Sequence, residues 1–206
     1  MLKAAHQKEA TVARLEVITG PMFSGKSEEL IRRLRREGYT GKKILAVKPR
    51  IDIRTEELIA ARSKGAAGKF ERTLAFIAKP VDNEKELAAL VLSPRNGPDI
   101  LGVDEAQFFG PWFADLVRKL LLRDYIEKII VAGLDMDAWG RPFGPMPTLL
   151  AMADDVRKET AVCFKCRKAS AMMTQKTSKG SGSQIEVGDA GLYEARCRNC
   201  WTPPED

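Results

Sequence analysis

The chain has 206 residues, of which 44% are hydrophobic and 30% are charged, as is typical of a globular protein of one or two domains. No stretch approaches the roughly 20 apolar residues that cross a membrane, and the N-terminal residues lack the apolar run of a secretion signal. We therefore expect a cytoplasmic protein without a membrane partner. The formal charge of +6 favours an anionic partner, and phosphorylated small molecules account for it without nucleic acid.

The first part of the chain predicts alternating strands and helices after a polar tail at residues 1–12. A short apolar strand at 15–19 runs into a glycine-rich segment, and a helix follows at 28–37, with leucine and isoleucine at helical spacing. Gly38 is a suitable C-cap for that helix, because glycine readily adopts the left-handed conformation that often ends one. A second strand is predicted at 43–47.

Further along the chain, the alternation of strands and helices continues and then stops. The segments predicted next are an irregular charged excursion at 50–68, a strand at 72–77, a helix at 83–92, a strand at 100–103, a helix at 112–122, a strand at 128–132 and a proline-rich loop at 136–147. Apolar strands separated by helices indicate a mainly parallel sheet that is covered on both faces. We therefore predict an α/β domain over 13–156 and a separate small β domain over 157–206.

The glycine-rich segment after the first strand matches the phosphate-binding P-loop pattern in full. Its residues are Gly20, Pro21, Met22, Phe23, Ser24, Gly25, Lys26 and Ser27. The glycines allow backbone N–H groups to surround phosphate oxygens at the start of a helix. Lys26 is expected to reach the β- and γ-phosphates of ATP, and the Ser27 hydroxyl to bind Mg²⁺. A chance glycine-rich turn is the alternative, and the flanking strand and helix disfavour it.

Two adjacent carboxylates, Asp104 and Glu105, follow the apolar strand at 100–103. Behind a complete P-loop, the first is expected to help hold Mg²⁺. The second projects to the other side of the strand end, where it can act as a general base on an acceptor hydroxyl. The alternative is a solvated acidic turn.

Four cysteines form two Cys-x-x-Cys pairs in the last quarter of the chain, Cys163 with Cys166 and Cys197 with Cys200. Without a secretion signal, such pairs favour metal ligation over disulfides. Two tight turns of this kind give a closed tetrahedral Zn²⁺ site, which is structural because no coordination position remains for water. Ligation by four thiolates would lower the net charge to about +4. Two disulfides or a redox-active pair are the alternatives.

Six motifs, in order, resemble those of the type II thymidine kinases. They are GPMFSGKS at 20–27, KPRIDIR at 48–54, DEAQFF at 104–109, AGLD at 132–135, RPFG at 141–144 and YEARCRNC at 193–200. The resemblance implies a RecA-like P-loop domain, a small zinc-bearing lasso domain and a homotetramer. It also implies transfer of the γ-phosphate of ATP to the 5′-hydroxyl of thymidine or deoxyuridine, with Mg²⁺ as a cofactor and Zn²⁺ as a structural ion.

The same resemblance implies roles for single residues. Glu105 is the implied catalytic base, and Lys26 and Arg54 are the implied catalytic cations. Further residues implied in the nucleotide site are Asp52, Asp104 and Gln107. The residues implied to contact the nucleoside are Met22, Phe108, Leu134, Phe143, Thr174, Val187 and Tyr193.

One segment departs from the pattern that the chain resembles. A phenylalanine that packs on the pyrimidine is usual where this chain has Ala138, and a basic or polar residue is usual where it has Trp139. Either Trp139 replaces the missing ring or the base pocket is larger. Two alternatives to thymidine phosphorylation stay open, namely the same reaction on another nucleoside and a zinc-ribbon ATPase that depends on nucleic acid.

Overall fold

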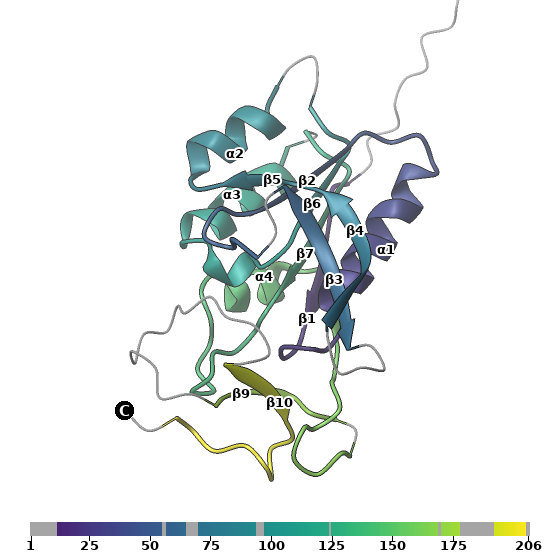
Figure 1. The fold of residues 1–206 in the computed structure, drawn as a ribbon. Helices are drawn as coiled ribbons and strands as arrows, with labels where there is room; N and C mark the ends of the chain where they lie inside the picture. Colours follow the sequence, from purple (N-terminus) through teal and green to yellow (C-terminus); the bar gives the residue numbers. More distant parts are fainter. Residues whose placement is uncertain are drawn as a thin grey trace, which may run out of the picture.

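The centre of the molecule is a six-stranded parallel sheet (Figure 1). The computed structural model describes residues 12–54, 57–64, 70–93, 97–123, 125–168, 170–177 and 192–204. The strand order is β5 (Lys79–Val81), β2 (Ile44–Pro49), β6 (Ile100–Val103), β7 (Lys128–Gly133), β1 (Arg14–Thr19) and β8 (Asp155–Lys158). Every neighbouring pair in this sheet is parallel, so the predicted mainly parallel α/β fold is confirmed.

Helices cover both faces of this sheet, as Figure 1 shows. The elements on one face are α1 (Lys26–Gly38) and a hairpin of β3 (Leu58–Lys64) and β4 (Phe70–Ile77). The elements on the other face are α2 (Glu84–Val91), α3 (Trp112–Leu121) and α4 (Met146–Met152). Successive residues of β7 serve the two layers in turn, since Ile129 packs with the second group and Ile130 packs with the first. Because both faces of β7 are covered, its residues from Ile129 to Ala132 are all apolar and buried.

α1 packs closely over β6 at Gly102. A Cβ atom on this glycine would lie 2.6 Å from Cδ1 of Leu34, a distance that real Cβ contacts do not reach. The absence of a side chain therefore lets α1 lie directly on the sheet. Because α1 begins within the P-loop motif, this contact also fixes the position of the predicted phosphate site.

Three predictions about the elements of the chain are wrong. Gly38 is the last residue of α1, and the C-cap is Tyr39 in a right-handed conformation. Residues 58–64, predicted to be irregular, form β3, which pairs antiparallel with β4 outside the main sheet. The loop predicted at 136–147 is shorter, because α4 begins at Met146.

Other predictions correspond to elements with different partners or limits. The strand predicted at 72–77 is part of β4, but it belongs to the hairpin and not to the parallel sheet. The helix predicted at 83–92 is α2, and Asn83 caps it by accepting a hydrogen bond of 3.0 Å from the backbone N–H of Glu86. β8 pairs with β1 as far as Lys158, so the main sheet extends past the predicted boundary at residue 156.

Beyond β8, the described chain forms a small antiparallel pair, β9 (Met173–Lys176) and β10 (Tyr193–Arg196). A cluster of Ala161, Cys163, Ala171 and Ala195 forms a separate apolar core beside it. Nearly all of the predicted N-terminal tail lies outside the described residues. Within the described ranges, no helix is long and apolar enough to span a membrane.

Candidate active site and zinc site

The carboxyl ends of the parallel strands bring the predicted site residues to one edge of the sheet. The P-loop follows β1, Asp52 and Arg54 follow β2, and Asp104 and Glu105 follow β6. Ends of parallel strands in one open sheet lie on the same side, which is where such folds bind ligands. Residues far apart in the chain therefore meet at this end of the sheet, which we call the catalytic edge after the roles predicted for them.

The backbone of the P-loop depends on its glycines. Gly20 has a φ of 136° and Gly25 a φ of 83°, and side chains rarely tolerate these conformations. A Cβ atom on Gly20 would also lie 2.3 Å from the carbonyl oxygen of Glu159. Phe23 is exceptional, because it has a φ of 64° without being glycine. These conformations turn the chain tightly into α1, as a loop that surrounds phosphate requires.

Lys26 is a buried cation at the centre of this edge. Its Nζ donates a hydrogen bond of 2.7 Å to the carbonyl oxygen of Pro21. Burial lowers the pKa of Lys26, and the carboxylates of Glu105, Asp104 and Asp135 act in the opposite direction. A phosphate anion in this position would favour the charged form of the lysine.

Asp104 and Ser27, the two predicted magnesium ligands, lie together. The Asp104 side chain is buried and hydrogen-bonded with the Ser27 side chain. Burial, followed by the neighbouring charge of Glu105, raises the pKa of Asp104 to about 7. An aspartate and a serine hydroxyl are the oxygen donors that Mg²⁺ prefers, so these residues fit the ion.

Glu105 has a left-handed backbone conformation with a φ of 52°. Two side chains donate hydrogen bonds to its carboxylate. Its Oε1 accepts a hydrogen bond of 2.5 Å from Nη2 of Arg54, and its Oε2 accepts one of 2.5 Å from Nε2 of Gln107. Burial raises the pKa of Glu105, but the charges of Arg54 and Lys26 and these hydrogen bonds outweigh that effect and lower it to about 2. Glu105 is therefore ionised, as a proton acceptor must be.

Arg54 links Glu105 to a second carboxylate. Its Nε donates a hydrogen bond of 2.6 Å to Oδ1 of Asp52. The other oxygen of Asp52 lies 3.4 Å from Nζ of Lys48, which is only 1% exposed. Sequence reasoning assigned no role to Lys48, although its place at the end of a buried strand was a usable signal.

Gln107 connects the catalytic edge to the loop after β7. Its Oε1 accepts a hydrogen bond of 2.9 Å from the backbone N–H of Leu134. A Cβ atom on Gly144 would lie 2.2 Å from the carbonyl oxygen of Gln107, so this loop packs directly against the segment that carries Glu105. The nearby Phe108 and Phe143 rings make an edge-to-face contact with centroids 5.7 Å apart.

The remaining predicted nucleoside residues lie partly in the C-terminal region. The backbone N–H of Met22 donates a hydrogen bond of 3.1 Å to Oγ1 of Thr174, so these two residues of β9 and the P-loop are in contact. Tyr193 is buried in β10. Val187 lies outside the described residues.

Trp201, a residue that sequence reasoning did not identify, binds the segment around Ala138. Nε1 of Trp201 donates to the carbonyl oxygens of Ala138 and Thr174, each at 3.3 Å. The Trp139 ring instead lies near two cations, with Cζ of Arg141 at 4.9 Å and Nζ of Lys176 at 5.6 Å from its centroid. The position of Trp201 after the last cysteine pair was the available signal.

The four cysteines form a cluster that could hold a metal ion. The sulfur atoms of Cys163, Cys166, Cys197 and Cys200 all lie within 4.8 Å of one another. Burial raises the pKa of the Cys163 thiol, but hydrogen bonds from backbone N–H groups outweigh it and lower that pKa to about 6. Four thiolates at this spacing suit tetrahedral Zn²⁺.

A further ion pair that sequence reasoning missed spans the start of the P-loop. Nζ of Lys158, at the end of β8, lies 2.5 Å from Oδ2 of Asp135, after β7. Because β1 lies between these two strands, the pair crosses over the strand that leads into Gly20. The order of the strands in the sheet brings Lys158 and Asp135 together, so the sequence alone does not predict their ion pair.

A P-loop at the end of the first strand of a parallel sheet, with an acidic pair two strands away, is typical of P-loop proteins that bind nucleoside triphosphates. The chain matches the family model described as thymidine kinase over residues 13–201. Proteins named thymidine kinase from Bdellovibrio bacteriovorus and Coprothermobacter proteolyticus are 42% and 40% identical over 192 and 187 residues. These alignments cover 93% and 89% of this chain and 87% of each relative. The chain belongs to the thymidine kinase family.

Proposed function

We propose that the protein transfers the γ-phosphate of ATP to the 5′-hydroxyl of thymidine or deoxyuridine. The observation that carries this proposal is the ionised carboxylate of Glu105 beside Arg54 and Lys26. A carboxylate next to cations suits an in-line transfer, in which a hydroxyl loses its proton as it attacks phosphorus. Relatives with the name thymidine kinase support the choice of nucleoside.

In the proposed reaction, the 5′-oxygen forms a bond to the γ-phosphorus and the bond to the bridging oxygen of ADP breaks. The hydroxyl proton passes to Glu105. Lys26 and Arg54 stabilise the negative charge that spreads over the transferred group. Ser27 and Asp104 would hold Mg²⁺, which supplies neutralisation of the phosphate charge.

The arginine contact also sets the basicity of Glu105. While Arg54 binds Glu105, the pKa of this carboxylate is low and the group is a weak base. Bound phosphates compete for the guanidinium, so nucleotide binding would raise the pKa of Glu105 toward the range of an effective base. Asp52 would keep Arg54 nearby, because it holds the other side of the guanidinium.

The test is the variant Glu105→Gln, which keeps the shape of the side chain and removes its ability to accept a proton. We expect thymidine-dependent formation of thymidine monophosphate to fall by about 10²-fold or more in turnover. Binding of ATP and thymidine, measured by calorimetry, should remain. Glu28→Gln, at an exposed position of α1, is the matched control. Parental turnover in Glu105→Gln would exclude this residue as the base and make Asp52 the next candidate.

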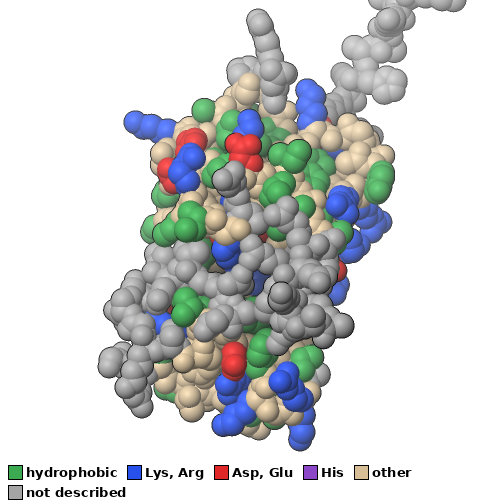
Figure 2. All heavy atoms as spheres, viewed as in Figure 1, with side chains coloured by type: hydrophobic (Ala, Val, Ile, Leu, Met, Phe, Trp, Pro, Cys, Tyr) green, Lys and Arg blue, Asp and Glu red, His purple; other side chains and the backbone are tan. Residues whose placement is uncertain are grey.

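A second candidate is the same transfer to another nucleoside. It is favoured by the small side chain of Ala138, whose carbonyl oxygen is bound by Trp201. A panel of nucleosides, each tested for 5′-monophosphate formation, separates the two candidates. Dependence of ADP release on single-stranded DNA, and not on a nucleoside, would instead favour a nucleic-acid-dependent ATPase. On the face seen in Figure 2, Lys and Arg side chains occur in several separate groups, which gives little support to that alternative.

We also propose a cytoplasmic homotetramer, which rests on the family resemblance. Light scattering of the purified protein tests the subunit number.

A further inference from the structure

An aromatic contact joins the P-loop to the segment that carries the first cysteine pair. The ring of Phe23 lies with its centroid 5.4 Å from that of Phe164, at an interplanar angle of 39°. Phe164 follows Cys163 directly and so belongs to the first of the two cysteine turns. Phe23 is also the P-loop residue that adopts a left-handed conformation without being glycine.

Both rings belong to the apolar surroundings of the cysteine cluster. Phe23 and Phe164 pack against the buried group that includes Cys163 and Ala195, and the other three cysteines pack against the same group. The backbone N–H of Phe164 donates a hydrogen bond of 2.9 Å to the carbonyl oxygen of Ala195 in β10. The position of the Phe164 ring is therefore set by the same turns that bring the four thiols together.

Two backbone contacts connect the same parts of the chain. The N–H of Glu159 donates a hydrogen bond of 2.7 Å to the carbonyl oxygen of Thr19, just before the P-loop. The N–H of Met22 donates to Oγ1 of Thr174. Three residues of the segment that begins after β8 therefore contact the P-loop or the strand end before it. Of these three, Phe164 is the one that lies in a cysteine turn.

The left-handed conformation of Phe23 is unfavourable for an L-residue and persists only where its surroundings hold it. A P-loop binds phosphate by directing backbone N–H groups inward, so a relaxed conformation at Phe23 would turn some of them away. The packing of its ring on Phe164 opposes that relaxation. Bound zinc would oppose the same relaxation indirectly, because it would keep the first cysteine turn, and with it Phe164, in place.

We propose that Phe164 is a positioning residue for the phosphate site, acting through Phe23, and that zinc binding and ATP binding strengthen each other through this contact. The inference rests on the proposed function, since it takes ATP as the ligand of the P-loop. The reciprocal effect follows from linkage, because two ligands that favour the same conformation must each raise the affinity of the other.

The first test compares Phe164→Ala with Phe164→Leu and Phe164→Tyr, with Val162→Ala, at an exposed position of the same turn, as the control. We expect Phe164→Ala to raise the Kd of a non-hydrolysable ATP analogue about tenfold, the scale of a lost aromatic contact. The KM for ATP should rise in parallel, whereas the KM for thymidine should change by less than about twofold. Phe164→Tyr should restore most of the affinity, and Phe164→Leu part of it.

The zinc content of Phe164→Ala must be measured alongside its affinity for the ATP analogue. The inference requires that Phe164→Ala retains its metal and still binds the analogue more weakly. Unchanged analogue affinity in a zinc-loaded Phe164→Ala protein would overturn it, as would an equal rise in both KM values. If the wild-type protein bound no ATP analogue at all, the proposed function itself would fail, so the two failures can be told apart.

A second measurement uses the wild-type chain and does not depend on the folding of a variant. Zinc affinity is measured by competition with a colorimetric chelator, with the ATP analogue and Mg²⁺, with thymidine alone, and with neither. The ATP analogue should raise the zinc affinity by the same factor by which zinc raises analogue affinity. Equal zinc affinity in all three conditions would overturn the coupling.

Discussion

Two neighbouring side chains at the catalytic edge, Lys26 and Glu105, have lowered pKa values for different physical reasons. Burial lowers the pKa of Lys26, whereas the charges of Arg54 and Lys26 hold the pKa of Glu105 low against the effect of burial. Bound phosphates would attract both cations. They would favour the charged form of Lys26 and at the same time weaken the contact of Arg54 with Glu105, the proposed base.

Replacement of Lys26 by alanine tests the phosphate site directly. Lys26→Ala should reduce turnover by about 10²-fold or more, because it removes a charge that stabilises the transition state. The melting temperature should hardly change, since the variant also removes a desolvated ammonium group. Lys43→Ala, at an exposed lysine, is the control in the same phosphate-transfer assay. Turnover of Lys26→Ala within about tenfold of the parent would contradict the P-loop assignment.

Ala138 offers a test of the base pocket. Its side chain is buried, and Trp201 covers its carbonyl oxygen. Ala138→Phe should therefore overpack this segment, at a cost of about 1–3 kcal/mol, and raise the KM for thymidine. Ala151→Phe, at an exposed position of α4, controls for the added ring. A lower KM in Ala138→Phe would mean that the position opens into a pocket with room for an aromatic ring.

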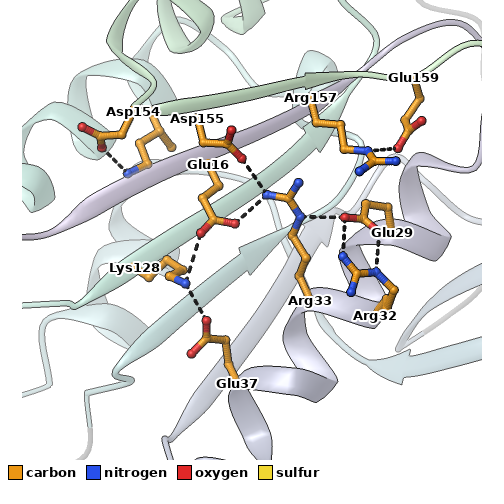
Figure 3. A network of polar contacts seen from close by, with 11 residues as sticks. Glu16, Glu29, Arg32, Arg33, Glu37, Lys128, Asp154, Asp155, Arg157 and Glu159 are labelled. Carbon is orange, nitrogen blue, oxygen red and sulfur yellow. Dashed lines mark hydrogen bonds and ion pairs between the residues drawn. The ribbon is translucent and has the colours of Figure 1, made fainter.

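At the scale of whole elements, a network of charges fastens α1 to the edge of the sheet (Figure 3). Arg33 of α1 contacts Glu16 of β1 at 2.6 Å, Asp155 of β8 at 3.1 Å and Glu29 of its own helix at 2.8 Å. Lys128 of β7 contacts Glu16 at 3.1 Å. Because the P-loop joins β1 to α1, these contacts hold the two sides of the phosphate site in register.

The stability of this network should depend on pH through Glu29. Hydrogen bonds from Arg32 and Arg33 lower the pKa of Glu29 from 4.5 to about 2, although burial opposes them. A carboxylate with a lowered folded pKa adds stability above its unfolded pKa, and that stability is lost as the pH falls from about 4.5 toward 2. Glu29→Gln should therefore lower the melting temperature at pH 7 and have less effect near pH 3. A difference in melting temperature between Glu29→Gln and the parent that does not change with pH would contradict the assignment.

The elements that could be predicted from the sequence are those with a strong local signal. The strand at 100–103 is wholly buried, and Asn83 is a typical N-cap, so both are found where they are expected. β3 could not be predicted in the same way, because its pairing with β4 is set by a partner strand and not by its own pattern. The ion pair of Lys158 at the site could not be predicted either, because its partner Asp135 becomes a neighbour only through the order of the strands in the sheet.

At the scale of the whole molecule, the catalytic edge lies between two parts of unequal stability. The parallel sheet has a large apolar core on both faces, whereas β9 and β10 contribute four residues each and have only a small apolar cluster. A two-stranded sheet of this size is marginal in water without further support. The four thiols, if they bind zinc, supply that support.

We therefore expect the purified protein to contain about one Zn²⁺ per chain, because four thiolates complete one tetrahedral site. Removal of the metal by a chelator should expose the amides of β9 and β10 to hydrogen exchange while those of β6 and β7 stay protected. Elemental analysis gives the metal content, and exchange measured by mass spectrometry gives the order of opening. Cys197→Ser should reproduce the effect of the chelator, whereas Ser170→Ala, at an exposed serine outside the thiol cluster, should not. A metal-free protein with four titratable thiols and fully protected β9 and β10 would show that this segment folds without zinc. The support of Phe23 by Phe164 would then depend on packing alone.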